Sequence, residues 1–383
     1  MQYSLKTPGV SVKTVCHVLP YLAEGGTEKT AYNIIRGLGR KYRMLLLAPR
    51  GRALPDFLDL DVEYAEFPRI SGNVFGKVAA YKGKLAELDE AFGIDILHVH
   101  AAHEFLSFSR KVLKNVPILF HLHSHQGSDI SKAINYKLSA VIARRRADTL
   151  IAVSDEERRI IVSKGYPEAL VKVVYNGFEP GEDDDWDMIA EIKRTHGLEG
   201  SIIIGNLGRL NRTKRLDLLI EAFSLLKERT DEPLKLLIVG EGPEKERLMR
   251  IARDRLSGDV VFTGYINRGD RILKIFELFV LPTSYEGCSN VLVEAMSKRL
   301  PIVTTDVPSV RWMFEHRKDA LLFRKNDVSD LSRKMYELIT DSQLREKISK
   351  GAFERFERSF TMDRMLRRIE SIYESSLGRG QNR

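Results

Sequence analysis

Two glutamates eight positions apart are the first residues whose spacing suggests chemistry. Glu286 lies in a glycine-containing loop, and Glu294 falls in the second turn of a helix expected over Asn290–Lys298. Ser289 or Asn290 is a suitable N-cap for that helix. A helix N-terminus offers backbone N–H groups to a phosphate, and a carboxylate one turn deeper can accept hydrogen bonds from a ribose diol. The alternative is that Glu294 lies on a solvated helix face.

A cluster of cations forms the second signal. It lies between a strand expected over Ile202–Gly205 and a helix expected over Leu216–Arg229. Its members are Arg209, Arg212, Lys214 and Arg215. Such a cluster can neutralise a diphosphate, because arginine offers a fork of N–H donors and lysine a point charge. A solvated basic loop is the alternative interpretation.

Paired glycines follow the first expected strand. Gly25 and Gly26 allow the backbone to approach a ligand at a strand-to-helix turn. The pattern is not the G-x-G-x-x-G of dinucleotide enzymes. A tight turn without a ligand is the alternative.

Six of the nine histidines fall within 28 positions, namely His98, His100, His103, His121, His123 and His125. Imidazoles can orient a sugar hydroxyl, shuttle a proton or bind a metal. If the strand persists, alternation places His121, His123 and His125 on one face. A metal site is the less favoured interpretation, because the carboxylates of a metalloenzyme are missing. The third interpretation is that these histidines are structural and form their hydrogen bonds within the protein.

Apolar runs that predict strands alternate with helical patterns along most of the chain. In the first half the runs are Thr14–Leu19, Arg43–Ala48, Val62–Phe67, Asp95–Val99, Pro117–Leu122, Leu150–Val153 and Val171–Val174. In the second half they are Ile202–Gly205, Lys235–Val239, Val260–Thr263, Leu278–Leu281, Pro301–Thr304 and Ala320–Phe323. Continuously apolar runs favour parallel strands covered on both faces. We therefore expect an α/β protein with two doubly wound, Rossmann-like domains, whose ligands bind beyond the carboxyl ends of the strands.

A Pro-Gly break and an acidic run mark the expected domain boundary. We predict an N-terminal domain over residues 1–180, a linker over 181–200 and a C-terminal domain over 201–357. A helix over about 358–377 should pack back on the first domain, followed by a frayed tail from Gly378 to Arg383. The run Asp183–Asp185 resembles a metal-binding Asp-x-Asp motif, but it ends no apolar strand, so a linker is favoured.

Composition narrows the class of protein. The 383 residues contain only Cys16 and Cys288, which excludes a disulfide scaffold and a cysteine-built zinc site. We expect a cytoplasmic protein, because there is neither a signal peptide nor an apolar run of membrane-spanning length. The formal net charge of +8 favours an anionic partner.

One segment combines cations with an apolar stripe. Residues 130–146 carry Lys132, Lys137, Arg144, Arg145 and Arg146 and no acid. The apolar stripe of this segment is Ile130, Ile134, Leu138, Val141 and Ile142. Two interpretations remain open: a helix that lies on an anionic membrane, and a helix whose stripe is core and whose cations are its solvated face.

Taken in order, the motifs of residues 14–375 resemble the retaining glycosyltransferases of family 4, which have the GT-B fold. The matching segments are Gly25–Glu28, His123, Ala152–Ser154, Tyr175–Gly177, Gly208–Arg209, Lys214, Gly240–Pro243, Phe262–Tyr265 and Glu286–Glu294. The resemblance implies a metal-independent hexosyltransferase without a cofactor. Its donor would be a nucleotide-sugar, most simply a UDP-sugar, and its acceptor a saccharide or a lipid-linked molecule of cell-envelope or extracellular glycoconjugate synthesis.

The resemblance also implies roles for single residues. Arg209 and Lys214 would hold the donor diphosphate and stabilise the leaving group. Glu286 would contact the donor sugar, and His123 would contact it near the reacting carbon. The remaining donor-site residues would be Gly25, Gly26, Tyr265, Gly287, Ser289, Asn290, Val291 and Glu294. The C-terminal domain would bind the donor and the N-terminal domain the acceptor.

The sequence departs from the family pattern at two places. Arg215 stands where the family often has glycine, and Pro308-Ser309 replaces a frequent glycine pair. Neither change removes a proposed charge.

Two other functions remain open: a nucleotide-sugar epimerase of the same fold and a non-enzymic partner subunit. A dinucleotide oxidoreductase is disfavoured because G-x-G-x-x-G is missing, and no nucleic-acid-binding motif is visible.

Overall fold

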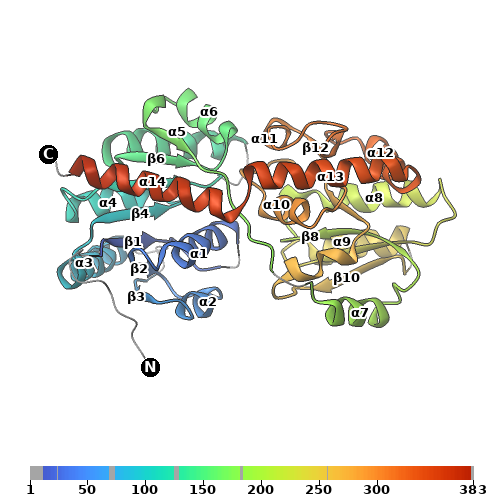
Figure 1. Cartoon of the computed structure of the whole chain (residues 1–383), viewed down its shortest axis with the longest axis horizontal. Helices are drawn as coiled ribbons and strands as arrows, with labels where there is room; N and C mark the ends of the chain where they lie inside the picture. The colour runs from blue at the N-terminus through green and yellow to red at the C-terminus, as the bar shows by residue number, and fades with distance from the viewer. Residues whose placement is uncertain are drawn as a thin grey trace. The chain divides into compact units, whose positions relative to one another are not determined.

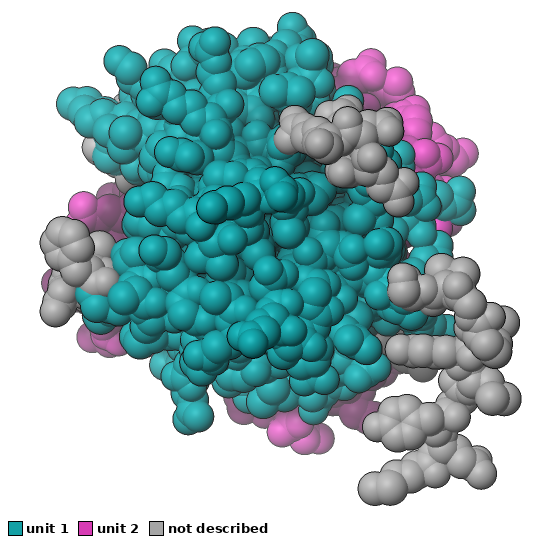
Figure 2. Space-filling model, turned by 90° about the vertical axis from the view of Figure 1, so that its left-hand side faces the viewer, with its two compact units in different colours: residues 1–175, 365–383 teal, residues 176–364 magenta. Residues whose placement is uncertain are grey.

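The computed structural model describes residues 12–23, 25–68, 74–124, 129–181, 184–256 and 258–380. The chain divides into two compact units, coloured separately in Figure 2. Unit 1 comprises Met1–Tyr175 and Met365–Arg383, and unit 2 comprises Asn176–Arg364. Each unit is built around its own parallel sheet (Figure 1).

The described part of unit 1 holds a 7-stranded sheet in the order β3-β2-β1-β4-β5-β6-β7, with every neighbouring pair parallel. Its strands are β1 (Thr14–Val18), β2 (Arg43–Ala48), β3 (Val62–Glu66), β4 (Ile96–His100), β5 (Ile118–Leu122), β6 (Thr149–Ala152) and β7 (Val171–Val173). Its helices are α1 (Gly26–Leu38), α2 (Leu54–Leu58), α3 (Val74–Phe92), α4 (Glu104–Val112), α5 (Asp129–Arg146), α6 (Asp155–Ser163), η1 (Glu168–Leu170) and α14 (Met362–Gly380), whose first residues belong to unit 2.

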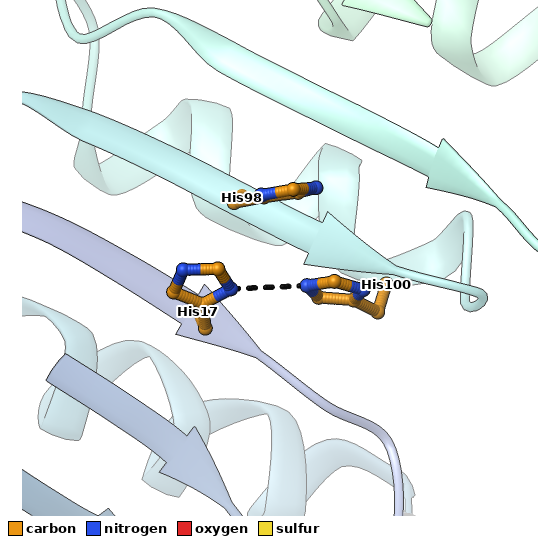
Figure 3. A group of neighbouring side chains, drawn as sticks. All are labelled: His17, His98 and His100. Carbon is orange, nitrogen blue, oxygen red and sulfur yellow. Dashed lines mark hydrogen bonds between the residues drawn. The ribbon is translucent and has the colours of Figure 1, made fainter. Parts of the chain in front are cut away.

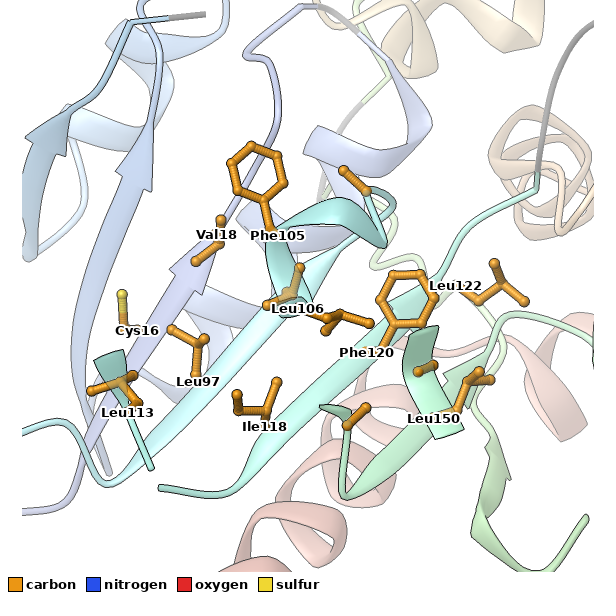
Figure 4. Close-up of a cluster of buried hydrophobic side chains, with 14 of the residues drawn as sticks. Cys16, Val18, Leu97, Phe105, Leu106, Leu113, Ile118, Phe120, Leu122 and Leu150 are labelled. Atoms are coloured by element: carbon orange, nitrogen blue, oxygen red, sulfur yellow. The ribbon is translucent and has the colours of Figure 1, made fainter. Parts of the chain in front are cut away.

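Alternation along the central strands sorts their side chains between the two faces of this sheet. Cys16 and Val18 of β1 belong to a core cluster that also contains Phe105 and Leu106 of α4 (Figure 4). His17 therefore projects from the opposite face. Because helices cover both faces, the strands are buried throughout, which explains their continuously apolar sequences.

The described part of unit 2 holds a 6-stranded parallel sheet in the order β10-β9-β8-β11-β12-β13. Its strands are β8 (Ile202–Leu207), β9 (Leu234–Val239), β10 (Val260–Gly264), β11 (Leu278–Leu281), β12 (Ile302–Asp306) and β13 (Leu321–Arg324). Its helices are α7 (Trp186–Thr195), η2 (Arg212–Lys214), α8 (Leu216–Lys227), α9 (Lys245–Arg255), η3 (Gly269–Ile275), α10 (Asn290–Ser297), α11 (Pro308–Arg311), α12 (Val328–Thr340) and α13 (Ser342–Ser359).

Both sheets have the doubly wound topology that the sequence predicts, and every expected strand is present within two residues of its expected bounds. Strand order reverses between β1 and β4 in unit 1 and between β8 and β11 in unit 2. In open parallel sheets ligands bind at this reversal, beyond the carboxyl ends of the strands. The reversal in each unit is thus the place to look for a site.

The structure differs from the sequence-based expectation in the segment assigned to a linker. Asp185 accepts a hydrogen bond from the backbone N–H of Met188 and so caps α7, which buries Ile189 and Ile192 in unit 2. Asp184 forms an ion pair with Lys298 at 2.5 Å. Both carboxylates therefore have structural partners, while Asp183 lies outside the described residues.

The C-terminal helix also runs further than the sequence suggests. The expected frayed tail begins at Gly378, but α14 continues to Gly380, and residues 381–383 lie outside the described range. Residues from Met365 onward belong to unit 1. None of the helices in the described residues is long and apolar enough to cross a membrane.

Candidate active site

Two loops meet at the strand-order reversal of unit 2. One follows β8 and the other follows β11. The backbone N–H of Ser284 donates to the carbonyl oxygen of Thr213 at 2.8 Å, and the Thr283 hydroxyl donates to the same oxygen at 3.1 Å. These bonds fix the β11 loop against the turn that carries Lys214.

The two loops bring together a cation and a carboxylate that lie 72 positions apart. Lys214 Nζ lies 2.7 Å from Glu286 Oε1, with side-chain exposures of 17% and 11%. The backbone N–H of Glu286 donates to Ser309 Oγ at 3.2 Å. The hydroxyl of Ser309 thus supports the loop, whereas the sequence had marked Ser309 only as a departure from the family pattern.

The helix N-terminus beside this pair is held in shape by Asn176. Its Nδ2 donates to the carbonyl oxygen of Cys288 at 3.0 Å and to Asn290 Oδ1 at 2.8 Å. Ser289 is the N-cap of α10, yet its side chain makes no capping hydrogen bond. Among the described residues, Ser289 Oγ is buried without a hydrogen-bond partner. The start of α10 therefore combines backbone N–H groups with an unused hydroxyl.

Glu294 lies in the second turn of α10, as the sequence predicts, but not on a solvated face. Its exposure is 4%, because the whole of α10 from Val291 to Ser297 is buried in unit 2. The interpretation of Glu294 as a solvent-facing helix residue is therefore wrong. Its predicted contact with a ribose remains a prediction. Gly287 and Val291, the other expected contributors, are also buried.

Glycines let neighbouring loops of unit 2 touch backbone to backbone. Gly240 has φ of +136°, and a Cβ there would lie 2.0 Å from the carbonyl oxygen of Gly208. A Cβ on Gly242 would lie 2.3 Å from the carbonyl oxygen of Leu210. The N–H of Leu210 donates to the carbonyl of Glu241 at 2.9 Å. The loops after β8 and β9 are thereby locked together beside Lys214.

The four cations of the expected cluster have different surroundings. Arg209 is exposed. Arg212 pairs with Glu244 at 3.1 Å, and Arg215 pairs with Asp217 at 3.2 Å. Arg215 has φ of +49°, a left-handed conformation that glycine adopts without strain. Tyr265, on the loop after β10, is 53% exposed.

Unit 1 carries the remaining predicted residues. Gly25 is the N-cap of α1, and Gly26 is its first residue; both are exposed. His123 follows β5 and is 8% exposed, and burial lowers its pKa to about 3. His125 lies outside the described residues. His103 lies apart from the strand histidines at the start of α4, where its Nδ1 is 3.0 Å from the Ser139 hydroxyl.

Two family models match consecutive parts of the chain. The model described as Glycosyltransferase Family 4 matches residues 24–182, and the model described as Glycosyl transferases group 1 matches residues 188–355. The chain therefore belongs to the family 4 glycosyltransferases and has the GT-B fold.

Similar proteins are also glycosyltransferases. N-acetyl-alpha-D-glucosaminyl L-malate synthase of Bacillus anthracis is 25% identical over 77% of this chain and 78% of its own length. The capsular polysaccharide biosynthesis glycosyltransferase CapH of Staphylococcus aureus is 24% identical over 80% of this chain and 85% of its own. The crystal structure of Anabaena HepE with UDP and glucose superposes with a TM-score of 0.82, at 19% identity, over 95% of this chain and 100% of that one.

Proposed function

We propose that this glycosyltransferase moves a hexose, with retention, from a nucleoside diphosphate donor bound by unit 2. The observation that carries the proposal is the meeting of Lys214 and Glu286 beside the N-terminus of α10, at the reversal of strand order. A cation, a carboxylate and the backbone N–H groups of a helix N-terminus in one place suit a diphosphate next to a sugar.

Departure of a nucleoside diphosphate develops negative charge, and the proposed site offers positive charge to stabilise it. Lys214 supplies a full charge from a half-buried position, Arg209 a second, and the N-terminus of α10 a partial one. A bound diphosphate would compete with Glu286 for the ammonium group of Lys214 and release that carboxylate toward the sugar. Because these groups stabilise the leaving group, we propose that the reaction needs no metal.

The rest of the donor would lie along the neighbouring loops. Glu294, buried one turn inside α10, would accept hydrogen bonds from the ribose hydroxyls. The exposed ring of Tyr265 offers a stacking surface for the base. The unused hydroxyl of Ser289 and the backbone N–H groups from Gly287 to Val291 would bind phosphate oxygens.

Unit 1 would bind the acceptor. His123 would contact the transferred sugar, and Gly25 and Gly26 would let the backbone approach the diphosphate and the acceptor. The names of relatives support a UDP-hexose donor and a saccharide acceptor of the cell envelope: CapH acts in capsular polysaccharide biosynthesis, and HepE has been solved with UDP-glucose.

We further propose that α5 lies on an anionic membrane surface. The exposures of Ile130, Ile134, Leu138 and Val141 are 75%, 54%, 44% and 44%. We call these four residues the α5 stripe. The interpretation of the stripe as core is therefore wrong. Only Ile142 of the expected set packs partly against the core.

A different face of α5 attaches the helix to unit 1. Tyr136, Ala140 and Ala143 are its buried contacts with the core cluster. The α5 stripe is accompanied by the exposed cations Lys137, Arg144 and Arg145, and residues 130–146 contain no acid. Exposed apolar side chains beside cations suit the interface of an anionic bilayer, which would place unit 1 beside a lipid-linked acceptor.

The donor proposal is tested by thermal unfolding of the purified chain with UDP, GDP, ADP, UDP-glucose, UDP-GlcNAc and NAD, in EDTA and then in Mg²⁺. A ligand at about 100 times its dissociation constant adds about 2.7 kcal/mol of stability. We expect one nucleoside diphosphate and the corresponding nucleotide-sugar to stabilise the chain, each by the same amount in EDTA as in Mg²⁺. Stabilisation that requires Mg²⁺ would contradict metal independence, and no stabilisation would favour a partner subunit without donor binding.

Transfer and epimerisation are separated by their products. With the selected nucleotide-sugar and a saccharide acceptor, a transferase releases the nucleoside diphosphate and extends the acceptor. The alternative epimerase would consume no acceptor and would return a nucleotide-sugar of changed configuration. Product analysis by mass spectrometry and proton NMR distinguishes the two outcomes.

A further inference from the structure

Five histidines and one tyrosine of unit 1 form a continuous chain of hydrogen bonds. In order, its members are His123, His100, His17, Tyr373, His98 and His121. We call this set the imidazole chain. All its members are 0% exposed except His123, which is 8% exposed. The chain therefore runs through the protein interior and reaches the surface only at His123.

Parallel strand pairing brings these residues together. His17 of β1 is in register with His98 of β4, and His100 of β4 with His121 of β5. All project from the face opposite the core cluster of Figure 4. Figure 3 shows the rings of His17, His98 and His100 and the bond between His17 and His100. Tyr373 reaches the rings from α14.

Each contact joins one nitrogen to the next group. The distances are 3.3 Å for His123 Nε2 to His100 Nδ1, 3.0 Å for His100 Nε2 to His17 Nδ1, 3.4 Å for His17 Nε2 to the Tyr373 hydroxyl, 2.7 Å for that hydroxyl to His98 Nδ1, and 3.2 Å for His98 Nε2 to His121 Nδ1. Burial lowers the pKa of every one of these histidines, so each is neutral and has one N–H donor and one acceptor.

The order of donors along the chain is then constrained. Every contact needs one donor and one acceptor, so the choice at any ring fixes its neighbours. If protons point toward His121, all five rings are Nε2–H tautomers; if they point toward His123, all five are Nδ1–H tautomers. The Tyr373 hydroxyl transmits this choice, because it donates to one ring and accepts from the other.

His121, the last ring of the imidazole chain, selects between the Nε2–H and the Nδ1–H order. Among the described residues, His121 Nε2 is buried without a partner. With Nε2–H tautomers this atom would be a buried donor lacking an acceptor, whereas with Nδ1–H tautomers it is an unshared lone pair. Buried unpaired N–H groups are rarer than under-used acceptors, which favours the Nδ1–H order.

We propose that the imidazole chain holds His123 as the Nδ1–H tautomer and thereby makes it a hydrogen-bond donor toward the transferred sugar. His100 is a positioning residue that acts through His123. Tyr373 joins the two halves of the imidazole chain. This inference rests on the role proposed for His123, but the tautomers can be measured without any activity.

The direct test is a two-bond ¹H–¹⁵N correlation spectrum of the full chain labelled with ¹⁵N-histidine, at neutral pH in EDTA. We expect five histidines with Nδ1–H signatures. Tyr373→Phe cuts the chain in the middle, and either order then leaves one buried N–H of the His98–His121 pair without an acceptor, so these two rings should show both tautomers. The other three rings should keep theirs, because an Nε2–H on His17 would be a buried donor without an acceptor. An Nε2–H tautomer among the five in the wild type, or unchanged spectra in Tyr373→Phe, would overturn the proposal.

A matched control and a metal titration complete this test. Tyr42 packs edge-on against Tyr373, with ring centroids 5.5 Å apart, so Tyr42→Phe removes a nearby hydroxyl and leaves the chain intact. Its spectrum should match the wild type. Two triplets of these rings also have the spacing of metal ligands. Binding of Zn²⁺ that shifts the ring nitrogens of a triplet at neutral pH would contradict the proposal, because ligating nitrogens cannot bond one another.

The consequence for catalysis is tested at His100, the ring that bonds to His123. His100→Asn keeps an amide N–H at the position of Nδ1, whereas His100→Leu removes the donor. We expect kcat to fall about 10-fold or more in His100→Leu and to recover in His100→Asn. Affinity for the nucleoside diphosphate without its sugar should stay unchanged in both, because His123 is proposed to contact the sugar, whereas Lys214 and α10 of unit 2 are proposed to bind the diphosphate. Equal kcat in both variants would overturn the positioning role of His100. A wild-type protein that does not bind the donor would instead contradict the proposed function.

Discussion

Glu294 shows how a single residue of unit 2 acquires its proposed role. The sequence left it either as a ribose ligand or as a solvated helix residue, and its 4% exposure removes the second interpretation. The helix begins with an unused serine hydroxyl, which suits a phosphate, and carries the buried carboxylate in its second turn. A carboxylate at that place suits the ribose attached to such a phosphate. This burial could have been deduced from the sequence, because α10 is apolar nearly all around and such a helix is buried on all sides.

Glu294→Gln should weaken donor binding by about 10-fold to 100-fold, because hydrogen bonds to a charged acceptor contribute about 1.5–3 kcal/mol. Titration calorimetry with the nucleoside diphosphate that stabilises the wild type measures the effect. Glu346→Gln, an exposed substitution in the same unit, should leave the affinity unchanged. Equal affinities in the two variants would remove Glu294 from the site.

At the scale of elements, most of the fold could be predicted and part of the site could not. Continuously apolar runs located the strands because parallel strands are buried on both faces. The helix α7 was missed because the acidic run before it suggested a linker, although Ile189 and Ile192 already had helical spacing. The role of Ser309 was missed because nothing in its local sequence shows that it meets the loop of Glu286.

The imidazole chain illustrates a similar limit. Alternation correctly placed His121 and His123 on one face, but His17 lies about 80 positions before the other histidines, and only the pairing of β1 with β4 brings it to His98. Tyr373 joins from the opposite end of the sequence. Strand order, which a single sequence does not specify, therefore decides which histidines meet.

The loop contacts in unit 2 make a prediction for Gly240. In Gly240→Ala the new Cβ would collide with the carbonyl oxygen of Gly208 at 2.0 Å, in addition to the cost of a positive φ. Gly200→Ala is a matched control, because Gly200 has φ of +70° and open space around its Cβ position. We expect a loss of about 1 kcal/mol in the control and clearly more in Gly240→Ala, measured by urea unfolding.

Only Gly240→Ala should also weaken donor binding, since its collision displaces the loop that leads to Lys214. Donor affinity is measured by calorimetry on both variants. A Gly240→Ala protein with wild-type stability and affinity would contradict the view that these loops are locked together.

The α5 stripe makes a prediction about membranes. Replacing Ile134 and Leu138 by serine should strongly reduce sedimentation with vesicles that contain phosphatidylglycerol, because both side chains are exposed and neither supports the core. Leu58→Ser is the control, since Leu58 is 54% exposed on α2 in the same unit. Wild-type binding that is equal for neutral and anionic vesicles, or a double variant that binds as well as the control, would contradict the membrane proposal.

At the scale of the whole molecule, the buried histidines link stability to pH. Burial lowers the pKa of His17 and His123 from 6.5 to about 3 and lowers those of the other three rings as well. Below pH 6.5 the unfolded chain therefore binds protons that the folded chain does not, so stability falls as pH falls. The hydroxyl of Tyr373, the sixth member of the imidazole chain, keeps its proton because burial raises its pKa.

We expect the free energy of unfolding to be nearly constant above pH 7 and to fall between pH 6.5 and pH 5, by up to about 1.4 kcal/mol per pH unit for each buried histidine. Urea unfolding at a series of pH values measures this slope. Carboxylates contribute mainly below that window, so the slope there reports the histidines. A flat profile between pH 7 and pH 5 would show that these rings take up protons in the folded protein as they do in the unfolded chain, and would contradict the lowered pKa values.

The measurement that tests the central claim most directly is the binding of the selected nucleoside diphosphate, in EDTA, to Lys214→Ala. The matched control is Lys325→Ala, an exposed lysine of the same unit. We predict that Lys325→Ala binds as the wild type does, and that Lys214→Ala loses about 10-fold or more in affinity, because it removes a charge-assisted contact with phosphate. Wild-type affinity in Lys214→Ala would contradict the assignment of the diphosphate to the meeting point of Lys214 and Glu286.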